Sequence, residues 1–289
     1  EKGKLKRESL ARHLQWLAKQ GIHGILANGS SSQFPLLTVE ERELVMETVA
    51  ELADSLPVIA NISDLDPRIV SRLGRTAASI GLSGIAIMPP SFYFSRDTDQ
   101  LAWFHRAAEA ADMPVLLYNY PELTGNRIDP WTIREFARNA PLAGIKQSGG
   151  EFDYHHELIQ LGRELGFSVF SGADTRLPEL FTMGASGCIG GMVNFVADLM
   201  VEQFRICMLG ESGTLGPTVQ KMEQMGEIFT RETFPANMSV GMRARGFDPG
   251  VGRQVLSPET QEFLRIMEAE LRRHFHEWGI VPIEEKLLS

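Results

Sequence analysis

Lys146 is the residue whose type and setting point most directly to chemistry. It lies in the stretch GIKQSG at residues 144–149, and no other lysine occurs between Lys19 and Lys221. An ammonium on an apolar strand loses its water, which favours the neutral amine. A neutral lysine amine is a nucleophile toward a carbonyl carbon, and the Schiff base that it forms can accept electrons. The alternative is a lysine at a strand end whose ammonium reaches solvent.

Two other stretches carry hydroxyl groups that would serve a reaction at a carbonyl. Tyr118 opens YNYPELTG at residues 118–125, and a tyrosine hydroxyl can relay protons during imine formation and carbon–carbon cleavage. The stretch NGSSSQ at residues 28–33 offers small hydroxyls and backbone N–H groups, which can receive a carboxylate. Alternatively, Tyr118 is an aromatic packing residue, and a Gly/Ser cluster also marks ordinary loops.

Short apolar runs rich in β-branched residues alternate along the chain with longer segments of helical period. This alternation is typical of βα units around a parallel sheet. The strands that it predicts lie at 24–28, 57–62, 84–89, 115–120, 144–148, 167–172 and 187–191. The helices lie at 5–20, 39–54, 67–81, 98–111, 130–139, 151–165, 175–184 and 197–210.

The pattern holds one helix more than it holds strands, and the printed sequence begins at a helix. It therefore predicts a (β/α)8 TIM barrel whose first strand would precede residue 1. An open doubly wound sheet is the alternative, but no Gly-x-Gly-x-x-Gly follows an early strand, and the repeat persists through seven units. The active site of a TIM barrel lies at the carboxyl ends of its strands. Lys146, Tyr118 and the serine-rich turn at residues 29–33, called the serine turn below, are predicted to lie there.

After about residue 211 the predicted strands stop. The remaining helices are predicted near 214–232, 236–246 and 258–278. We expect a barrel at residues 1–211 and a C-terminal helical extension at residues 212–289, without a catalytic motif in the extension. Its expected role is packing on the barrel or on a neighbouring subunit.

The stretches singled out above resemble motifs of the dihydrodipicolinate synthase / N-acetylneuraminate lyase family of pyruvate-handling Schiff-base barrels. GSSSQ at 29–33 resembles that family's Gly-Thr-Thr-Gly-Glu turn, YNYPELTG resembles its tyrosine motif, and GIKQSGG at 144–150 resembles its lysine motif. The resemblance runs nearly end to end. SGAD at 171–174, GASGCIGGMVN at 184–194 and LSPE at 256–259 fall where the family has comparable segments.

The resemblance implies a role for each matching residue. Lys146 would form the Schiff base, Tyr118 would shuttle protons, and Ser30 would belong to the tyrosine-centred relay. Ser31, with the backbone amides of the turn that begins at Gly29, would hold the carboxylate of a 2-oxo acid.

Further residues concern the rest of the substrate. Ile189 would pack beside the bound pyruvyl unit, and Asp174 would either bind substrate hydroxyls or cap the next helix. The family's second relay tyrosine follows a proline pair and is often donated across a subunit interface. In PPSFYF we assign it to Tyr93, whereas Phe92 at that position would break the relay.

Leu123 bears on the choice of substrate. Dihydrodipicolinate synthases carry an arginine two residues after the proline of the tyrosine motif, and this sequence has Leu123 there. A leucine cannot replace a cation that binds a carboxylate through two hydrogen bonds. Lysine biosynthesis is therefore not expected, and the lyase and aldolase branches are favoured.

The resemblance implies a class I aldolase or lyase that needs no cofactor or metal. It would cleave or form a keto-deoxy sugar acid or hydroxy-oxo acid, with pyruvate and an aldehyde as the smaller partners. The alternatives are a Schiff-base dehydratase or hydratase–aldolase, a dihydrodipicolinate synthase, and a non-catalytic member that binds a metabolite. A homo-oligomer, either a dimer or a tetramer, is expected.

Composition excludes several other classes. The net charge of −9 comes without a basic stripe, so nucleic acid is not an expected partner. No apolar run approaches the roughly 18 residues of a membrane span and no signal-like segment opens the sequence, so we expect a cytoplasmic enzyme without a membrane partner. Cys188 and Cys207 lack C-x-x-C spacing, so neither a disulfide framework nor a zinc site is expected.

Overall fold

The computed structural model describes residues 4–211, 215–231 and 233–283. Its described residues form one sheet of seven parallel strands in sequence order, each hydrogen-bonded to the next. The strands are β1 (Ile25–Ala27), β2 (Val58–Asn61), β3 (Gly84–Ile87), β4 (Val115–Asn119), β5 (Leu142–Gln147), β6 (Ser168–Ser171) and β7 (Gly187–Cys188). All seven strands agree with the sequence-based prediction in order and approximate position.

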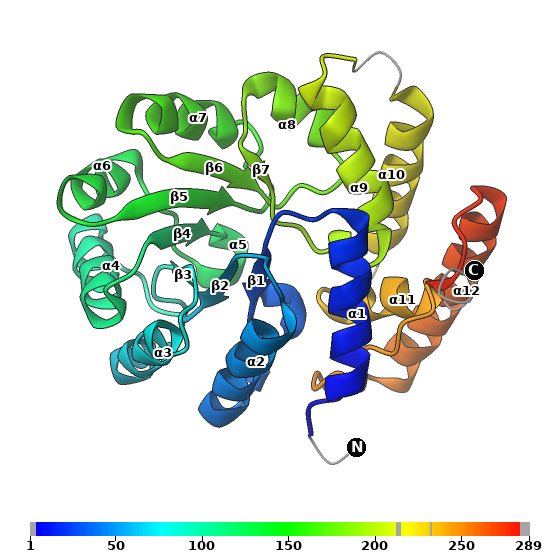
Figure 1. Ribbon diagram of the computed structural model, residues 1–289, viewed down its shortest axis with the longest axis horizontal. Coiled ribbons are helices and arrows are strands. Elements are labelled where there is room, and N and C mark those ends of the chain that lie inside the picture. The colour runs from blue at the N-terminus through cyan, green and yellow to red at the C-terminus, as the bar shows by residue number, and fades with distance from the viewer. Residues whose placement is uncertain (1–3, 212–214, 232, 284–289) are drawn as a thin grey trace.

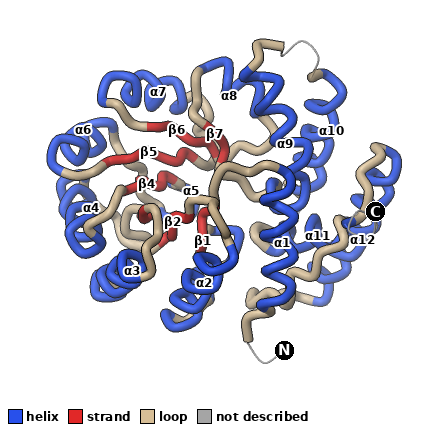
Figure 2. Tube along the Cα trace, viewed as in Figure 1, coloured by secondary structure: helices blue, strands red, loops and turns tan. Residues whose placement is uncertain are grey.

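Helices surround the curled sheet on its outside (Figures 1 and 2). They are α1 (Arg7–Gln20), α2 (Val39–Leu52), α3 (Pro67–Ser79), α4 (Asp97–Ala111), α6 (Pro130–Asn139), α7 (Tyr154–Leu165), α8 (Leu177–Met183) and α9 (Val193–Met208). Helix α1 packs against both α2 and α9, so it stands between the first and last βα units of the ring. The strand order never reverses, as it would in a doubly wound sheet. The fold is therefore that of a TIM barrel, and the doubly wound alternative is wrong.

The predicted first strand before residue 1 lies outside the described residues, which supply seven strands. Three short elements follow strand ends, at positions where the sequence pattern predicted loops. They are the 3-10 turns η1 (Ser30–Ser32) and η2 (Phe34–Leu36) after β1, and the short helix α5 (Pro121–Thr124) after β4. All three lie after the carboxyl ends of strands, where a TIM barrel carries its active site.

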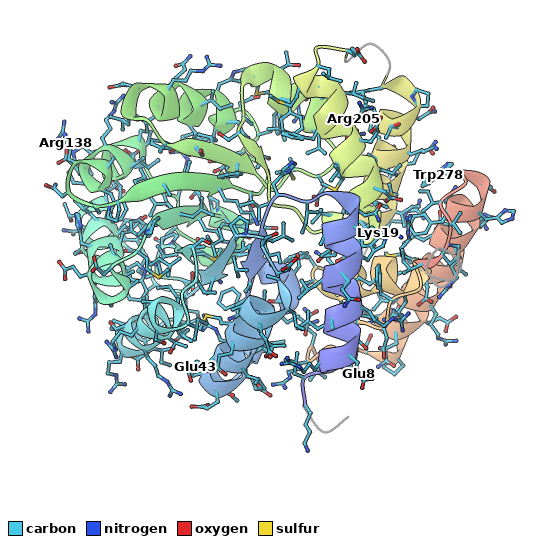
Figure 3. All side chains as sticks on the ribbon, viewed as in Figure 1. Glu8, Lys19, Glu43, Arg138, Arg205 and Trp278 are labelled. Carbon is cyan, nitrogen blue, oxygen red and sulfur yellow. The ribbon has the colours of Figure 1, made fainter. Side chains whose placement is uncertain are left out.

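Side-chain caps fix several helix starts. Thr38 accepts a hydrogen bond from the backbone of Glu41 while the Glu41 carboxylate accepts one from the backbone of Thr38, which together form a capping box before α2. Asp66 and Asp129 cap α3 and α6, and each precedes a proline at the first helical position. Charged side chains such as Arg138 and Arg205 lie on the outward side of the outer helices, whereas Glu43 of α2 pairs with Arg72 of α3 (Figure 3).

The C-terminal extension contains α10 (Gly216–Phe229), α11 (Ala236–Ala244) and α12 (Pro258–Glu277). Its apolar side chains, including those of Met222 and Met225, share one buried cluster with Phe195 and Val196 of α9. A Cβ at Gly241 would lie 2.5 Å from the Phe195 ring, so glycine allows α11 to approach α9 closely. The expected packing of the extension on the barrel is confirmed.

The predicted boundary between residues 211 and 212 falls where a gap in the described residues begins. None of the helices in the described ranges is long and apolar enough to cross a membrane.

Candidate active site

Lys146 and Tyr118 are brought together by the register of two neighbouring strands. Strand β5 pairs with β4 so that Lys146 stands opposite Tyr118, and Gln147 opposite Asn119. Lys146 Nζ donates a hydrogen bond to Tyr118 Oη over 2.9 Å. On the next pair, Asn119 Nδ2 donates to Gln147 Oε1 over 2.6 Å. Because successive side chains of a strand point to opposite faces, the first pair faces the cavity described below while the second braces the strands from the other side.

Ser30 extends this contact to a third element. Its Oγ lies 3.1 Å from Tyr118 Oη, and the serine is buried in turn η1 directly after β1. Since Lys146 donates to Tyr118 Oη, the tyrosine proton is free to point at Ser30 Oγ. The hydrogen bonds thus form a continuous chain from the lysine amine to the turn, which is the arrangement that a proton relay needs.

Lys146 is only 7% exposed, and the exposed part faces a cavity of about 660 Å³. That volume is in the range of about 300–1,000 Å³ that small-molecule sites occupy. Ser31, Tyr118, Asp174 and Ile189 also line the cavity, as their predicted substrate or catalytic roles require. Gly29 does not line it but forms the N-cap of η1, and so sets the direction of the turn.

Asp174 holds the segment before α9 in place. Its Oδ2 accepts hydrogen bonds from the backbone N–H groups of Gly191 and Met192, at 3.0 and 3.1 Å. Burial raises the pKa of this carboxyl, while the two N–H donors and nearby Lys146 act in the opposite direction. The prediction that Asp174 caps the next helix is wrong, since α8 begins after Arg176 without a side-chain cap.

Cys188 lies beside Asp174, with its Sγ 3.8 Å from Asp174 Oδ1. Burial and the adjacent carboxylate raise the pKa of the Cys188 thiol well above its ordinary value. A thiol that keeps its proton is a poor nucleophile. Lys146 is therefore the better candidate for covalent chemistry in this cavity.

Tyr93 does not line the cavity within a single chain. Its side chain is 73% exposed, and its ring packs edge-on against the exposed ring of Phe92 at 4.8 Å between centroids. Phe92 adopts a φ of +75°, a conformation rarely taken by residues other than glycine. The relay role of Tyr93 stays a prediction, and it requires a second subunit.

Leu123 is exposed on α5 and is not part of the cavity wall. Its neighbour Glu122 accepts a hydrogen bond from the Gly150 backbone over 2.5 Å, which joins the loop after β4 to the loop after β5. Tyr120, which precedes α5, lines the cavity instead. The substrate-binding role assigned to Leu123 stays a prediction.

Several cavity residues were not singled out from the sequence. Ser148 lies two residues after Lys146, so the alternation of side chains along a strand places both on the same side. Its place in the cavity could therefore have been predicted from the sequence. Glu223 and Glu227 reach the cavity from α10 of the extension. No local pattern could have revealed them, because their approach depends on how the extension packs on the barrel.

The extension also holds the serine turn. Gln33 Oε1, at the end of η1, accepts a hydrogen bond from the backbone N–H of Arg253 over 2.7 Å. The Arg253 guanidinium pairs with Glu41 and donates to the carbonyl of Leu36. We call these contacts of Arg253 with Gln33, Leu36 and Glu41 the turn clamp.

Within the described ranges, no three His, Cys, Asp or Glu side chains are grouped so that they could hold a metal ion. The cavity itself is lined by the Lys146 amine, by phenols, by serine hydroxyls and by carboxylates. These groups suit addition to a carbonyl and movement of protons.

Known proteins resemble this chain over nearly its whole length. A 4-hydroxy-tetrahydrodipicolinate synthase of Natronomonas pharaonis is 28% identical over 275 residues, which cover 92% of each protein. The crystal structure of YagE, a prophage protein of the dihydrodipicolinic acid synthase family from E. coli K12 in complex with pyruvate, superimposes with a TM-score of 0.87 at 23% identity. That superposition covers 96% of this chain and 94% of YagE.

A sialic acid aldolase of Ruminococcus gnavus superimposes with a TM-score of 0.83 at 21% identity, over 95% of this chain and 93% of the aldolase. The profile of the dihydrodipicolinate synthetase family matches residues 1–273. This chain thus belongs to the dihydrodipicolinate synthetase family, and with it to the lyase-type enzymes.

Proposed function

We propose that the protein is a class I aldolase or lyase in which Lys146 forms a Schiff base with a 2-oxo acid. The observation that carries the proposal is the hydrogen-bonded chain of Lys146, Tyr118 and Ser30 at the wall of the cavity. The substrate class is a keto-deoxy sugar acid or a hydroxy-oxo acid. The reaction releases pyruvate and an aldehyde, or joins them in reverse.

Lys146 Nζ attacks the C2 carbonyl of the substrate, and its excess proton passes to the oxygen through Tyr118. Tyr118 protonates the hydroxyl of the resulting carbinolamine, which leaves as water, and a protonated Schiff base remains beside the Tyr118 phenolate. The C4 hydroxyl then gives its proton to that phenolate as the C3–C4 bond breaks, and the electron pair of the bond moves into the iminium to give an enamine. The aldehyde leaves, and Tyr118 gives its proton to C3 of the enamine. Water then adds to the iminium, returns a proton to Tyr118 and releases pyruvate from Lys146.

The serine turn and Ile189 would hold the pyruvyl part. In this proposal Ser31 and the backbone amides of η1 bind the carboxylate, because N–H and O–H donors directed at one point form an anion site. Ile189, which also lines the cavity, would pack against the apolar C3 end. These contacts would keep C2 within reach of Lys146.

Borohydride reduction in the presence of pyruvate tests the proposal. Peptide mass spectrometry should find one reduced pyruvyl group on Lys146, and none in Lys146→Arg, which keeps the charge but not the nucleophile. An unmodified wild-type peptide would refute the proposal and favour a member that only binds a metabolite. Assay of products on sugar-acid and hydroxy-oxo acid substrates separates aldol cleavage, which releases pyruvate, from dehydration, which leaves the carbon chain intact.

The wider setting belongs to the same proposal. A dimer or tetramer would bring Tyr93 of one subunit near the site of another, and a cytoplasmic location suits a reaction on central metabolites. Mass photometry of the purified protein tests the oligomeric state directly. A monomer at assay concentration would remove Tyr93 from the mechanism.

A further inference from the structure

Helix α10 presents one polar stripe to the catalytic cavity. Glu223, Gly226, Glu227 and Thr230 line the cavity. Gly226 and Glu227 lie three and four residues after Glu223, and Thr230 lies three residues after Glu227, so the four share one face of the helix. The opposite side of α10, with Met222 and Met225, is buried in the apolar cluster of the extension. We call Glu223 and Glu227 the acidic pair.

The acidic pair reaches the cavity because glycine allows a close approach. A Cβ at Gly226 would lie 2.7 Å from Cγ2 of Thr175, in the segment after β6. Thr175 and Asp174 line the same cavity. A larger residue at 226 would force Thr175 or the helix to shift, so glycine is what permits this approach.

The carboxylates of the acidic pair are exposed to the cavity and to solvent. In the part of the chain that the structure describes, neither has a hydrogen-bond or ion-pair partner. Lys221 lies two residues before Glu223 but donates to the carbonyl of Trp278. Among the cavity-lining side chains that are described, Lys146 is the one lysine or arginine, and its nitrogen is neutral in the enamine that would attack an aldehyde.

A second feature points to a hydroxyl-rich ligand. Ser148 is only 6% exposed and lines the cavity, and its hydroxyl has no partner among the described residues. Buried hydroxyls are normally hydrogen-bonded in a folded protein. Ser148 therefore offers a donor and an acceptor to a molecule in the cavity, which Lys146 of β5 and the acidic pair of α10 also line.

We infer that the acidic pair selects an uncharged, polyhydroxylated aldehyde. This inference rests on the proposed function and narrows it to sugar acids that carry no second anionic group. Substrate hydroxyls would donate to Glu223 and Glu227, and hydrogen bonds to an ionised acceptor are stronger than those between neutral groups. A phosphate or second carboxylate would meet two like charges without a cation to offset them, so the pair acts against such substrates as well.

Two matched pairs of aldehydes test the inference in condensation with pyruvate. D-glyceraldehyde is compared with D-glyceraldehyde 3-phosphate, and glycolaldehyde with glyoxylate. The wild type should favour the neutral member of each pair by at least about tenfold in kcat/KM, because like charges brought together at a binding site repel each other. In the double variant Glu223→Gln, Glu227→Gln that preference should fall by about tenfold, mainly through KM for the aldehyde.

Glu109→Gln is the matched control. Glu109 is exposed on α4 and does not line the cavity, so Glu109→Gln removes one negative charge, half the change made by the double variant, without touching the site. Its aldehyde preference should equal that of the wild type. A double variant with unchanged preference, or a wild type that condenses the anionic aldehydes at least as well, would overturn the inference.

Trapping of pyruvate separates this inference from the function on which it rests. A wild type that forms the reduced adduct on Lys146 but favours anionic aldehydes, or condenses none of the four, refutes the role of the acidic pair and leaves the Schiff base standing. A wild type that forms no adduct refutes both. The double variant must still form the adduct, because neither glutamate contacts Lys146.

Discussion

Tyr118 and Lys146 occupy paired positions on adjacent parallel strands, and their side chains meet in a 2.9 Å hydrogen bond. Strand register, rather than a flexible loop, therefore sets the distance between the proposed nucleophile and the proposed proton carrier. Sites built on strands hold their geometry more tightly than sites built on loops. The contact is formed before any substrate binds, so changes to either side chain should act on chemistry more than on folding.

Tyr118→Phe removes the hydroxyl and keeps the ring. We expect kcat to fall by roughly 10²–10⁴, the usual contribution of a positioned proton carrier, and borohydride trapping to slow in parallel. Tyr154→Phe is the control, because Tyr154 is a buried tyrosine whose hydroxyl donates to the carbonyl of Ile128 and does not line the cavity. Equal losses of kcat in the two variants would argue against a relay through Tyr118.

Ser30→Ala breaks the far end of the same chain. Tyr118 would keep its contact with Lys146 but lose Ser30 Oγ, and we expect kcat to fall by about tenfold or more, with partial recovery in Ser30→Thr. Ser32 lies in the same turn, and its hydroxyl donates to the carbonyl of Gly29 over 2.6 Å. Ser32→Ala should therefore change the activity little. Steady-state kinetics of the three variants test this prediction. If Ser32→Ala lowers kcat as much as Ser30→Ala does, both serines act only by stabilising the turn, and Ser30 has no role in proton transfer.

Gly190→Ala should displace Asp174. A Cβ at residue 190 would lie 1.5 Å from Asp174 Oδ1, and the carboxylate cannot yield without disturbing its hydrogen bonds to Gly191 and Met192. We expect a loss of about 1–3 kcal/mol in the free energy of unfolding, measured by urea titration. In Gly216→Ala no described atom lies within 4 Å of the new Cβ, so stability should hold or rise. Similar losses in both variants would contradict this reading of Gly190.

His13 should make the protein less stable in mild acid. It is 8% exposed in α1, and burial lowers its pKa from an ordinary 6.5 to about 4, although Nε2 lies 2.8 Å from the Asn194 carbonyl. Between those two pH values the unfolded chain binds more protons than the folded one. The contribution of His13 to stability is therefore complete above pH 6.5 and declines as the pH falls, by about 2 kcal/mol at pH 5.

His13→Gln removes this titration while a side-chain donor remains. Urea unfolding at pH 7 and at pH 5 should show a smaller loss in the variant than in the wild type. Other buried groups, including His155, titrate in both proteins, so the difference between the two losses isolates His13. Equal losses would show that His13 does not titrate as its burial implies.

Much of the fold could be predicted from the sequence, because each strand and helix of a βα unit has its own local pattern of apolar residues. All seven strands appear near their predicted positions, and Lys146, Tyr118 and Ser30 meet because a TIM barrel gathers strand ends on one face. The turns η1 and η2 were read as loop, since three residues of 3-10 helix carry no period that a sequence shows.

What could not be predicted depends on distant contacts. The sequence treated the extension as packing material, yet Glu223 and Glu227 line the cavity, and this follows from the close approach of Gly226 to Thr175. Asp174 was expected either to bind substrate or to cap the helix that follows it. Instead its carboxylate reaches the N–H groups of Gly191 and Met192 before α9, 17 and 18 residues onward, which are partners that only the assembled barrel supplies.

The turn clamp has a consequence for protein engineering. Arg253 is separated from Gln33 by 220 positions, yet it helps fix the turn that carries Ser30 and Ser31. In a chimera that joins the barrel of one relative to the C-terminal extension of another, the two sides of the clamp would come from different proteins, and their side chains need not be complementary. Its nucleophile could be intact while its substrate carboxylate is misplaced, so exchanges of specificity should transplant the 248–256 loop and the 29–33 turn as one unit.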